Sequence, residues 1–512
     1  MRNKKVQSQT NPMPYRHENH AKPVTRRDFL AQGLIGGVGM AVGPSLLNLL
    51  GGSSEAYAAA INCNVPAPAT GSGKVPFICF DLAGGANIAG SNVLVGKQGG
   101  QLDLLDAAGY SKLGIASSML PSLSGQVDTT LGLAFHNSSS LLAGIKMKAT
   151  PATLAKVDGC VICVRSNDDT GNNPFNPMYG IAKAGAMGSL VALLGTQNTV
   201  SGGNSVAPAG QIEAKLRPTK VSSVADTRGL VDTGKLSAQL GGDGAVRVMQ
   251  AVERLSGAKS GKLPEADMVK NLLDCAYNGT TEKVQKFNNP NLLNPVADPN
   301  MTSLFPNNAN NGGINELADS EFIKTAAIMK LVIDGYAGAG TVQLGGFDYH
   351  DGNRVNGDRR DLKAGQAIGA VLEYARIKSR PVMIYVFTDG AVSSNGSADN
   401  NAGGKLVWTS DNGTCGAVLM LVYNPAGAGR PALKKTDVRQ LGYYRASGSV
   451  ETGATPLSNN VTQVAEAIVL NYLALHDDVG RFAQILPTHG LGPASSWDNY
   501  IAFQPIMPAP TT

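Results

Sequence analysis

Beyond its first 60 residues, the chain lacks any apolar run long enough to cross a membrane. It also lacks an excess of charge of one sign once its first 58 residues are set apart. Those residues hold seven of the 43 Lys and Arg and three of the 38 Asp and Glu, which leaves 36 basic and 35 acidic residues. No basic surface therefore indicates binding to nucleic acid. We also detect no internal repeat of the kind that marks solenoids or propellers.

The first 58 residues have the pattern of an export signal. A twin arginine, Arg26 and Arg27, precedes a moderately apolar stretch that ends in small residues, as in twin-arginine signal peptides. A membrane anchor is the alternative, but Pro44 and Gly51 interrupt the apolar stretch and leave it too short to span a bilayer. We therefore expect a bacterial protein that the twin-arginine translocase exports to the periplasm or beyond, with no stable membrane span after cleavage near Ala58.

Apolar runs alternate with helix-period segments over most of the remaining chain. The apolar runs are 75–87, 159–166, 340–348, 381–390 and 416–424, and the longest amphipathic segments are 314–337, 359–378 and 460–484. Buried strands that alternate with amphipathic helices predict an α/β fold, with a mostly parallel sheet and helices on both of its faces.

The expected length after cleavage, about 450 residues, exceeds the usual limit of roughly 250 to 300 residues for one core. We therefore expect an insertion or a second domain. Residues 186–312 are rich in Gly, Asn, Ser and Thr, which is typical of a loop-rich insertion or cap over the sheet. The expected organisation is a signal peptide at 1–58, a linker at 59–75, a first core part at 76–185, the insertion or cap at 186–312, a second core part at 313–504 and a disordered tail at 505–512.

All six cysteines follow the leader, and an oxidising compartment would permit disulfides among them, although the sequence selects no pairing. Cys160 and Cys163 form a CxxC pattern. They lie in an apolar run that predicts a buried strand, on which positions three apart face opposite sides. This favours two small core residues over a redox pair or a metal knuckle.

Three of the predicted strands end in acids, Asp81, Asp348 and Asp389. The carboxyl ends of parallel strands meet at one edge of a sheet, where ligands bind, and we expect His350 and Asp411 to join them there. Converging carboxylates repel one another unless a cation or a partner lies among them, which points to a metal site. The alternative is that each acid caps the helix that follows its strand.

The segments FDLAGGANIAGSN, GLAFHNSS, GGFDYH, VFTDG and TSDNGTCG follow one another in this order behind the leader. This order resembles that of an exported family of unknown function, distantly related to the alkaline phosphatase and sulfatase superfamily. The resemblance covers about residues 76 to 185 and 315 to 490. It implies an alkaline-phosphatase-like core and, as in the superfamily's enzymes, two divalent ions that clamp a phosphate or sulfate ester.

The resemblance places Asp348 and His350 on an Asp-x-His metal motif, and His136 on a Leu-His-Pro position. Asp411 and Asn412 stand on an Asp-His motif, so an amide replaces the expected imidazole. Asn137 replaces the proline of the Leu-His-Pro motif.

Further amides stand where the family has charged ligands. Asn87 occupies the position of an aspartate in the first turn, and Asn172, Asn173 and Asn176 fall where the family often has a Ser-His-Phe-Asp segment. Ser91 follows the first turn, where the superfamily places its nucleophile. The simpler interpretation of Ser91 is a loop hydroxyl bound to nearby backbone.

The exchange of charged ligands for amides predicts a reduced site that holds one divalent ion (Zn²⁺, Mg²⁺ or Ca²⁺) or none. We expect a binding or assembly role in the cell envelope, with an unknown partner. The alternatives are a metal-dependent hydrolase of phosphate or sulfate esters, and an accessory protein of a secretion or pilus system. The predicted metal ligands are Asp81, His136, Asp348, His350, Asp389, Asp411 and Asn412, with Ser91 as the catalytic candidate; His476 and His489 are expected to be solvated or core histidines.

Overall fold

The computed structural model describes residues 73–508 except 167–170, 309–312, 314, 436, 437 and most of 232–289. The signal peptide, nearly all of the linker, Cys63 and Cys275 lie outside the described residues. The chain divides into two compact units, residues 1–61 with 249–282 and residues 62–248 with 283–512. The described fold belongs to the second unit, because only residues 250, 251 and 254 of the first are described.

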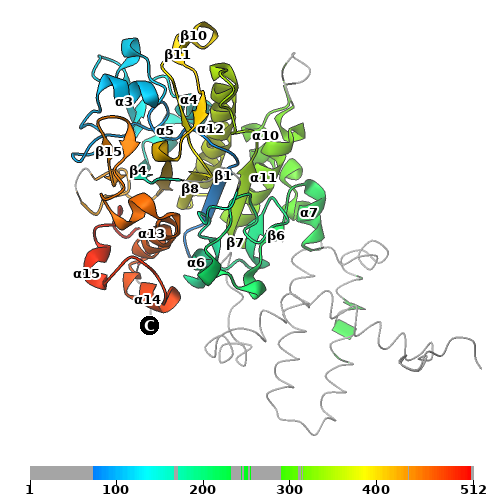
Figure 1. Cartoon of the computed structure of the whole chain (residues 1–512). Coiled ribbons are helices and arrows are strands. Elements are labelled where there is room, and N and C mark those ends of the chain that lie inside the picture. The colour runs from blue at the N-terminus through cyan, green and yellow to red at the C-terminus, as the bar shows by residue number, and fades with distance from the viewer. Residues whose placement is uncertain are drawn as a thin grey trace, which may run out of the picture. The chain divides into compact units, whose positions relative to one another are not determined.

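An eight-stranded sheet forms the centre of this unit, in the order β14-β4-β13-β8-β1-β7-β5-β6 (Figure 1). Only β13 runs against the other strands, since it is antiparallel to both of its neighbours, β4 and β8. The prediction of an α/β fold with a mostly parallel sheet is therefore confirmed. The strands are β1 (Phe77–Leu82), β4 (Val157–Cys163), β5 (Val191–Gly195), β6 (Thr219–Lys220), β7 (Ala337–Leu344), β8 (Val382–Thr388), β13 (Ala417–Tyr423) and β14 (Gln440–Leu441).

Side chains alternate along the central strand β1 and feed two separate cores. Ile78, Phe80 and Leu82 belong to one apolar cluster, and Phe77 and Cys79 belong to the other. A strand buried on both faces reads as a continuous apolar run, which is why the sequence of β1 shows no polar alternation. Both faces of the sheet are therefore buried, as expected for a sheet that helices cover on each side.

Helices from different parts of the chain cover the two faces (Figure 1). The core on the first face includes residues of α3 (Ala107–Lys112), α4 (Ser140–Lys148), α5 (Pro151–Leu154), α10 (Pro299–Leu304), α11 (Ser320–Ile333) and α12 (Arg354–Ile377). The second face packs against α6 (Met178–Lys183), α13 (Val461–Ala474), α14 (Phe482–Ile485) and α15 (Ala494–Trp497). A further short helix is α7 (Val224–Gly229).

Helix α12 begins five residues before the predicted segment, because the Asn353 side chain accepts a hydrogen bond from the Asn356 N–H and caps the first turn. The predicted segment 460–484 is divided. Helix α13 ends at Ala474, and Asp477 has a φ of +50°, a conformation that no helix continues through.

The segment 186–312 supplies part of the core sheet and not only a cap. β5 pairs in parallel with β7, and β6 extends the sheet beyond β5. The apolar sequence of β5 is buried between these neighbours. The boundary of the core therefore lies beyond residue 186, and most of residues 232–289 lie outside the described part of the chain.

The start of the tail is also held to the core. The N–H groups of Ile506 and Met507 both donate to the Leu475 carbonyl at 3.0 Å, and their side chains pack against the second core. The expected disorder therefore does not extend to these residues; 509–512 lie outside the described part.

Cys79, Cys160, Cys163 and Cys415 are buried and free of disulfides. Cys160 contributes to one core and Cys163 to the other, so the prediction of two separate core residues is confirmed.

None of the helices in the described part of the chain has the length and apolar character that a bilayer span requires.

Candidate metal site

Three connecting segments meet where the parallel strands end. The loop after β7 carries Asp348 and His350, and the chain after β8 forms β9 (Val392–Ser393), which pairs with β12 (Ser410–Asp411). Because β13 runs against its neighbours, the segment that leads into it lies at the same edge and brings Asp411 with it. The sheet topology therefore brings together residues that are about 60 positions apart in sequence.

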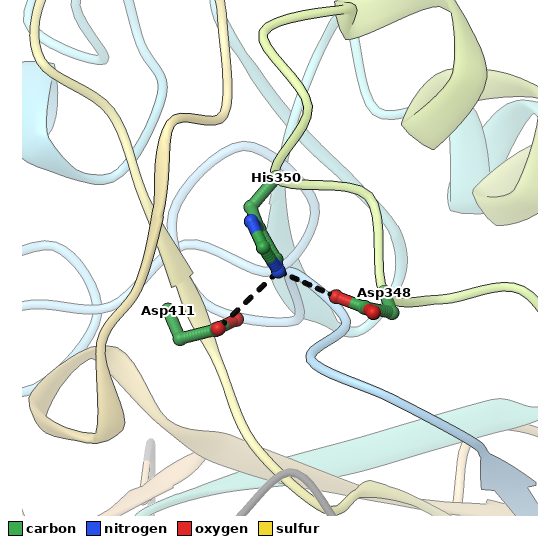
Figure 2. A group of neighbouring side chains, drawn as sticks. All are labelled: Asp348, His350 and Asp411. Carbon is green, nitrogen blue, oxygen red and sulfur yellow. Dashed lines mark ion pairs between the residues drawn. The ribbon is translucent and has the colours of Figure 1, made fainter.

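Two carboxylates converge on one imidazole nitrogen of His350 (Figure 2). Nε2 lies 2.7 Å from Asp348 Oδ1 and 3.3 Å from Asp411 Oδ2. One ligand atom from each residue lies within 4.8 Å of the other two. Since Nε2 carries at most one hydrogen, it can donate to only one carboxylate at a time, whereas a cation between the three atoms would satisfy all of them.

The cluster of Asp348, His350 and Asp411 is open to solvent. Their side chains are 63%, 38% and 43% exposed, respectively. An ion held by one imidazole and two carboxylates would keep coordination positions for water or a ligand, as in catalytic and exchangeable zinc sites. Mg²⁺ and Ca²⁺ prefer a fuller set of oxygen ligands.

The glycine turn that follows β1 lies against this cluster. Gly84 has a φ of +116°, and a Cβ there would overlap the backbone of Asp348. A Cβ on Gly85 would lie 3.3 Å from Asp411 Oδ1. Only glycine tolerates both the left-handed conformation and the close approach, so the turn fixes the distance between the two ligand segments.

On the inner side of this turn lies a buried carboxylate pair, Asp81 and Asp389. The backbone N–H groups of Asn204 and Ser205 donate to Asp81 Oδ2 at 2.6 and 2.9 Å. The side chains of the same two residues donate to Asp389. Burial and the nearby Asp389 carboxylate raise the pKa of Asp81 to about 7, because two buried like charges repel each other.

The pair is separated from the open cluster by the glycine turn. The Gly84 N–H lies 3.5 Å from Asp389 Oδ2, while Asp348 lies on the other side of Gly84. The structure therefore divides the predicted ligands at this edge into an exposed group of three and a buried group of two. Asn204 and Ser205 lie in a Gly- and Ser-rich loop whose sequence has no periodic signal, so sequence reasoning missed them.

Ser91 lies apart from both groups and is buried. Its hydroxyl accepts a hydrogen bond from Arg354 Nη2 at 2.9 Å and another from the Asn87 side chain. Arg354 is itself buried and stacks 4.5 Å from the centre of the Trp408 ring. The surroundings of Ser91 are thus an internal polar network, and Arg354 is its central residue, which the sequence did not single out.

His136 is likewise buried and fully engaged. Its Nδ1 lies 2.8 Å from Ser138 Oγ and its Nε2 lies 2.7 Å from the Met119 carbonyl. Burial lowers the pKa of His136. The structure does not bring this histidine into the cluster, and both ring nitrogens already have partners.

His476 is a core histidine, in line with one of the two alternatives for it. Its Nε2 accepts a hydrogen bond from the Val75 N–H at 2.9 Å, and Nδ1 donates to the Tyr472 carbonyl at 2.7 Å. Burial lowers the pKa of His476 to about 4. His489 packs between Phe482 and Trp497.

The amides at the positions that the resemblance singles out form hydrogen bonds within the protein. The Asn412 oxygen accepts from the Thr414 N–H and hydroxyl at 3.2 and 2.7 Å, capping a short 3₁₀-helix. Asn173 donates to Ser166 and to the Asp389 carbonyl, and Asn176 donates to Ser201 and Thr341. The side-chain oxygen of Asn412 thus faces its own loop while the neighbouring Asp411 faces His350.

Comparisons with protein-family models, with characterised proteins and with solved structures find no match for this chain.

Proposed function

We propose that this chain is an exported protein with an alkaline-phosphatase-like core that binds one divalent cation at its sheet edge and serves a binding or assembly role in the cell envelope. The observation that carries the proposal is the convergence of Asp348 and Asp411 on Nε2 of His350. The imidazole favours Zn²⁺ over Mg²⁺ or Ca²⁺. The leader sequence supports export by the twin-arginine translocase.

Binding is favoured over hydrolysis by the surroundings of the cluster. Two-ion hydrolases need two ligand sets a few ångströms apart. The second set of carboxylates, Asp81 and Asp389, is buried and receives hydrogen bonds from Asn204 and Ser205. Ser91, the candidate nucleophile, is enclosed with Arg354 in the internal network.

Elemental analysis of the protein purified from the periplasm without chelators tests the proposal. We expect about one equivalent of a divalent metal, lost in His350→Ala, because the imidazole is the only nitrogen ligand of the cluster. Asp351→Asn is the matched control, since this exposed acid lies in the same loop but outside the cluster. No metal in the unaltered protein, or equal metal in His350→Ala, would refute the cation site.

A metal-dependent phosphate or sulfate ester hydrolase is the second candidate function. The observation that favours it is the placement of Asp81 and Asp389 one glycine turn away from the exposed cluster. Ionised and released from Asn204 and Ser205, these carboxylates would offer ligands for a second ion. Two equivalents of metal, together with turnover of an aryl phosphate or aryl sulfate that His350→Ala abolishes, would favour this function over binding alone.

A further inference from the structure

A cleft of about 510 Å³ opens beside the metal cluster. One wall is the loop after β7, including Gly346, Asp348 and Asp351, and the other is the exposed face of the first turns of α12. Asp348 therefore belongs to both the cluster and the cleft, so an ion held there would face the space in which a ligand can lie. A ligand site in this cleft that uses such an ion rests on the proposed cation site.

The α12 wall presents an amide and three cations at helical spacing. Asn356, Arg359, Arg360 and Lys363 lie at positions i, i+3, i+4 and i+7, which places them along one side of the helix over about 10 Å. The cleft lining contains no aliphatic side chain, and its only aromatic residue, Tyr349, is buried. An apolar ligand would find nothing to pack against.

Two of the three cations are already neutralised. Lys363 Nζ lies 2.8 Å from Asp319 and 2.7 Å from Glu321, and Arg360 Nη1 lies 3.4 Å from Glu321. Arg359 is exposed and makes no hydrogen bond or ion pair with any residue that the structure describes. Its planar guanidinium is therefore free to bind a carboxylate through two parallel hydrogen bonds.

The net charge around the cleft further restricts the charge that a bound ligand can carry. Leaving histidine aside, the three cations of the lining and Lys324, which lies beside Glu321 and Asp319, meet five carboxylates: Asp319, Glu321, Asp348, Asp351 and Asp411. This excess of one negative charge opposes an anion, and one divalent cation would turn it into an excess of one positive charge. A carboxylate brings one negative charge, whereas a phosphate monoester brings about 1.5 to 2, so the carboxylate is the better electrostatic match.

We infer that the cleft binds a sugar acid, such as a uronate of an acidic glycan, with its carboxylate held jointly by the cation at the cluster and by Arg359. Hydroxyl groups of the sugar can bond to the polar lining, in which Asn356 Nδ2 also donates to Asp351 Oδ2 at 3.2 Å. An acidic peptide is the less suitable ligand, because peptide recognition relies on apolar anchors that the cleft does not offer.

Isothermal titration of the chelator-treated protein first with Zn²⁺ and then with trigalacturonate tests this inference. We expect trigalacturonate to bind only after Zn²⁺, and Arg359→Gln to weaken trigalacturonate binding by about tenfold or more while leaving Zn²⁺ binding unchanged. Arg376→Gln is the matched control, since this half-exposed arginine lies at the other end of the same helix; it should not change either affinity.

The outcomes separate the two proposals. Zn²⁺ binding without trigalacturonate binding refutes the sugar-acid inference and leaves the cation site standing. Absence of Zn²⁺ binding refutes the cation site itself, and trigalacturonate binding without Zn²⁺ refutes joint coordination. Tighter binding of triglutamate would assign the cleft to an acidic peptide, and tighter binding of inorganic phosphate would assign it to a phosphate ligand, so either result overturns the inference. Equal binding of neutral maltotriose would show that the carboxylate plays no part.

Discussion

At the scale of single residues, the hydrogen bond from Arg354 to Ser91 indicates that Ser91 has a structural role. Its hydroxyl is the acceptor for a buried guanidinium nitrogen of Arg354, and a buried charged donor that loses its acceptor bears a desolvation cost. We expect Ser91→Ala to lower the free energy of unfolding by about 1 to 3 kcal/mol, and to leave cation binding unchanged. Urea denaturation and Zn²⁺ titration measure the two effects.

Ser447→Ala is the control for this prediction, because Ser447 is exposed. Its unfolding free energy should change by less than about 0.5 kcal/mol. If Ser91→Ala were as stable as the unaltered protein and abolished turnover of an ester substrate, Ser91 would be a nucleophile and the network interpretation would be wrong.

The sequence could predict a candidate ligand only where the order and direction of the strands alone determine its position. Asp348, His350 and Asp411 come together because they follow or precede strands that end at one edge, which the apolar runs indicate. The side chains of His136 and Asn412 are directed by local hydrogen bonds to Met119 and Thr414, and no sequence pattern announces such bonds. The sequence therefore indicates the edge, and local geometry selects the ligands.

At the scale of elements, the glycine turn after β1 controls the spacing of the ligand segments. We expect Gly84→Ala to weaken Zn²⁺ binding about tenfold or more, because its Cβ would displace the backbone at Asp348. Gly352→Ala is the matched control: Gly352 also has a positive φ, +78°, but no atom lies within 4 Å of its Cβ position.

Gly352→Ala should cost about 1 to 2 kcal/mol of stability through the left-handed backbone alone and retain the cation affinity. Calorimetric titration with Zn²⁺ and urea denaturation separate the two contributions. Equal Zn²⁺ affinities for Gly84→Ala and the unaltered protein would show that the turn does not set the ligand spacing.

The strands of the sheet could be predicted from the sequence according to their length. The five-residue strand β5 was missed, because it lies in the Gly- and Ser-rich segment that was predicted to be an insertion or cap. The five apolar runs correspond to β1, β4, β7, β8 and β13, since runs of this length have a clear apolar signature. The strands β6 and β14 have two residues each, which is too short for any period to show. The reversed direction of β13 also leaves no mark in its sequence, because a strand buried on both faces is apolar in either direction.

At the scale of the whole molecule, buried ionisable groups make stability depend on pH in two opposing ways. Burial raises the pKa of Asp361 from 3.8 to about 7, so the folded chain binds a proton that the unfolded chain has lost, and stability falls as pH rises through this window. Burial lowers the pKa of His476 from 6.5 to about 4, so the unfolded chain binds the extra proton, and stability rises with pH.

Between about pH 4 and pH 6.5 the two groups oppose each other, each with an effect on the order of 3 kcal/mol. Asp361→Asn should therefore make stability rise more steeply with pH over this window, because the falling contribution is removed. His476→Gln should make the curve flatter or falling. Urea denaturation at half-unit steps of pH measures both slopes, and the comparison of slopes is independent of any constant loss of stability in either variant. Parallel curves for the two variants would mean that neither side chain keeps its shifted pKa in the folded chain. Water would then reach Asp361 and His476, although the packing of α12 and α13 is expected to exclude it.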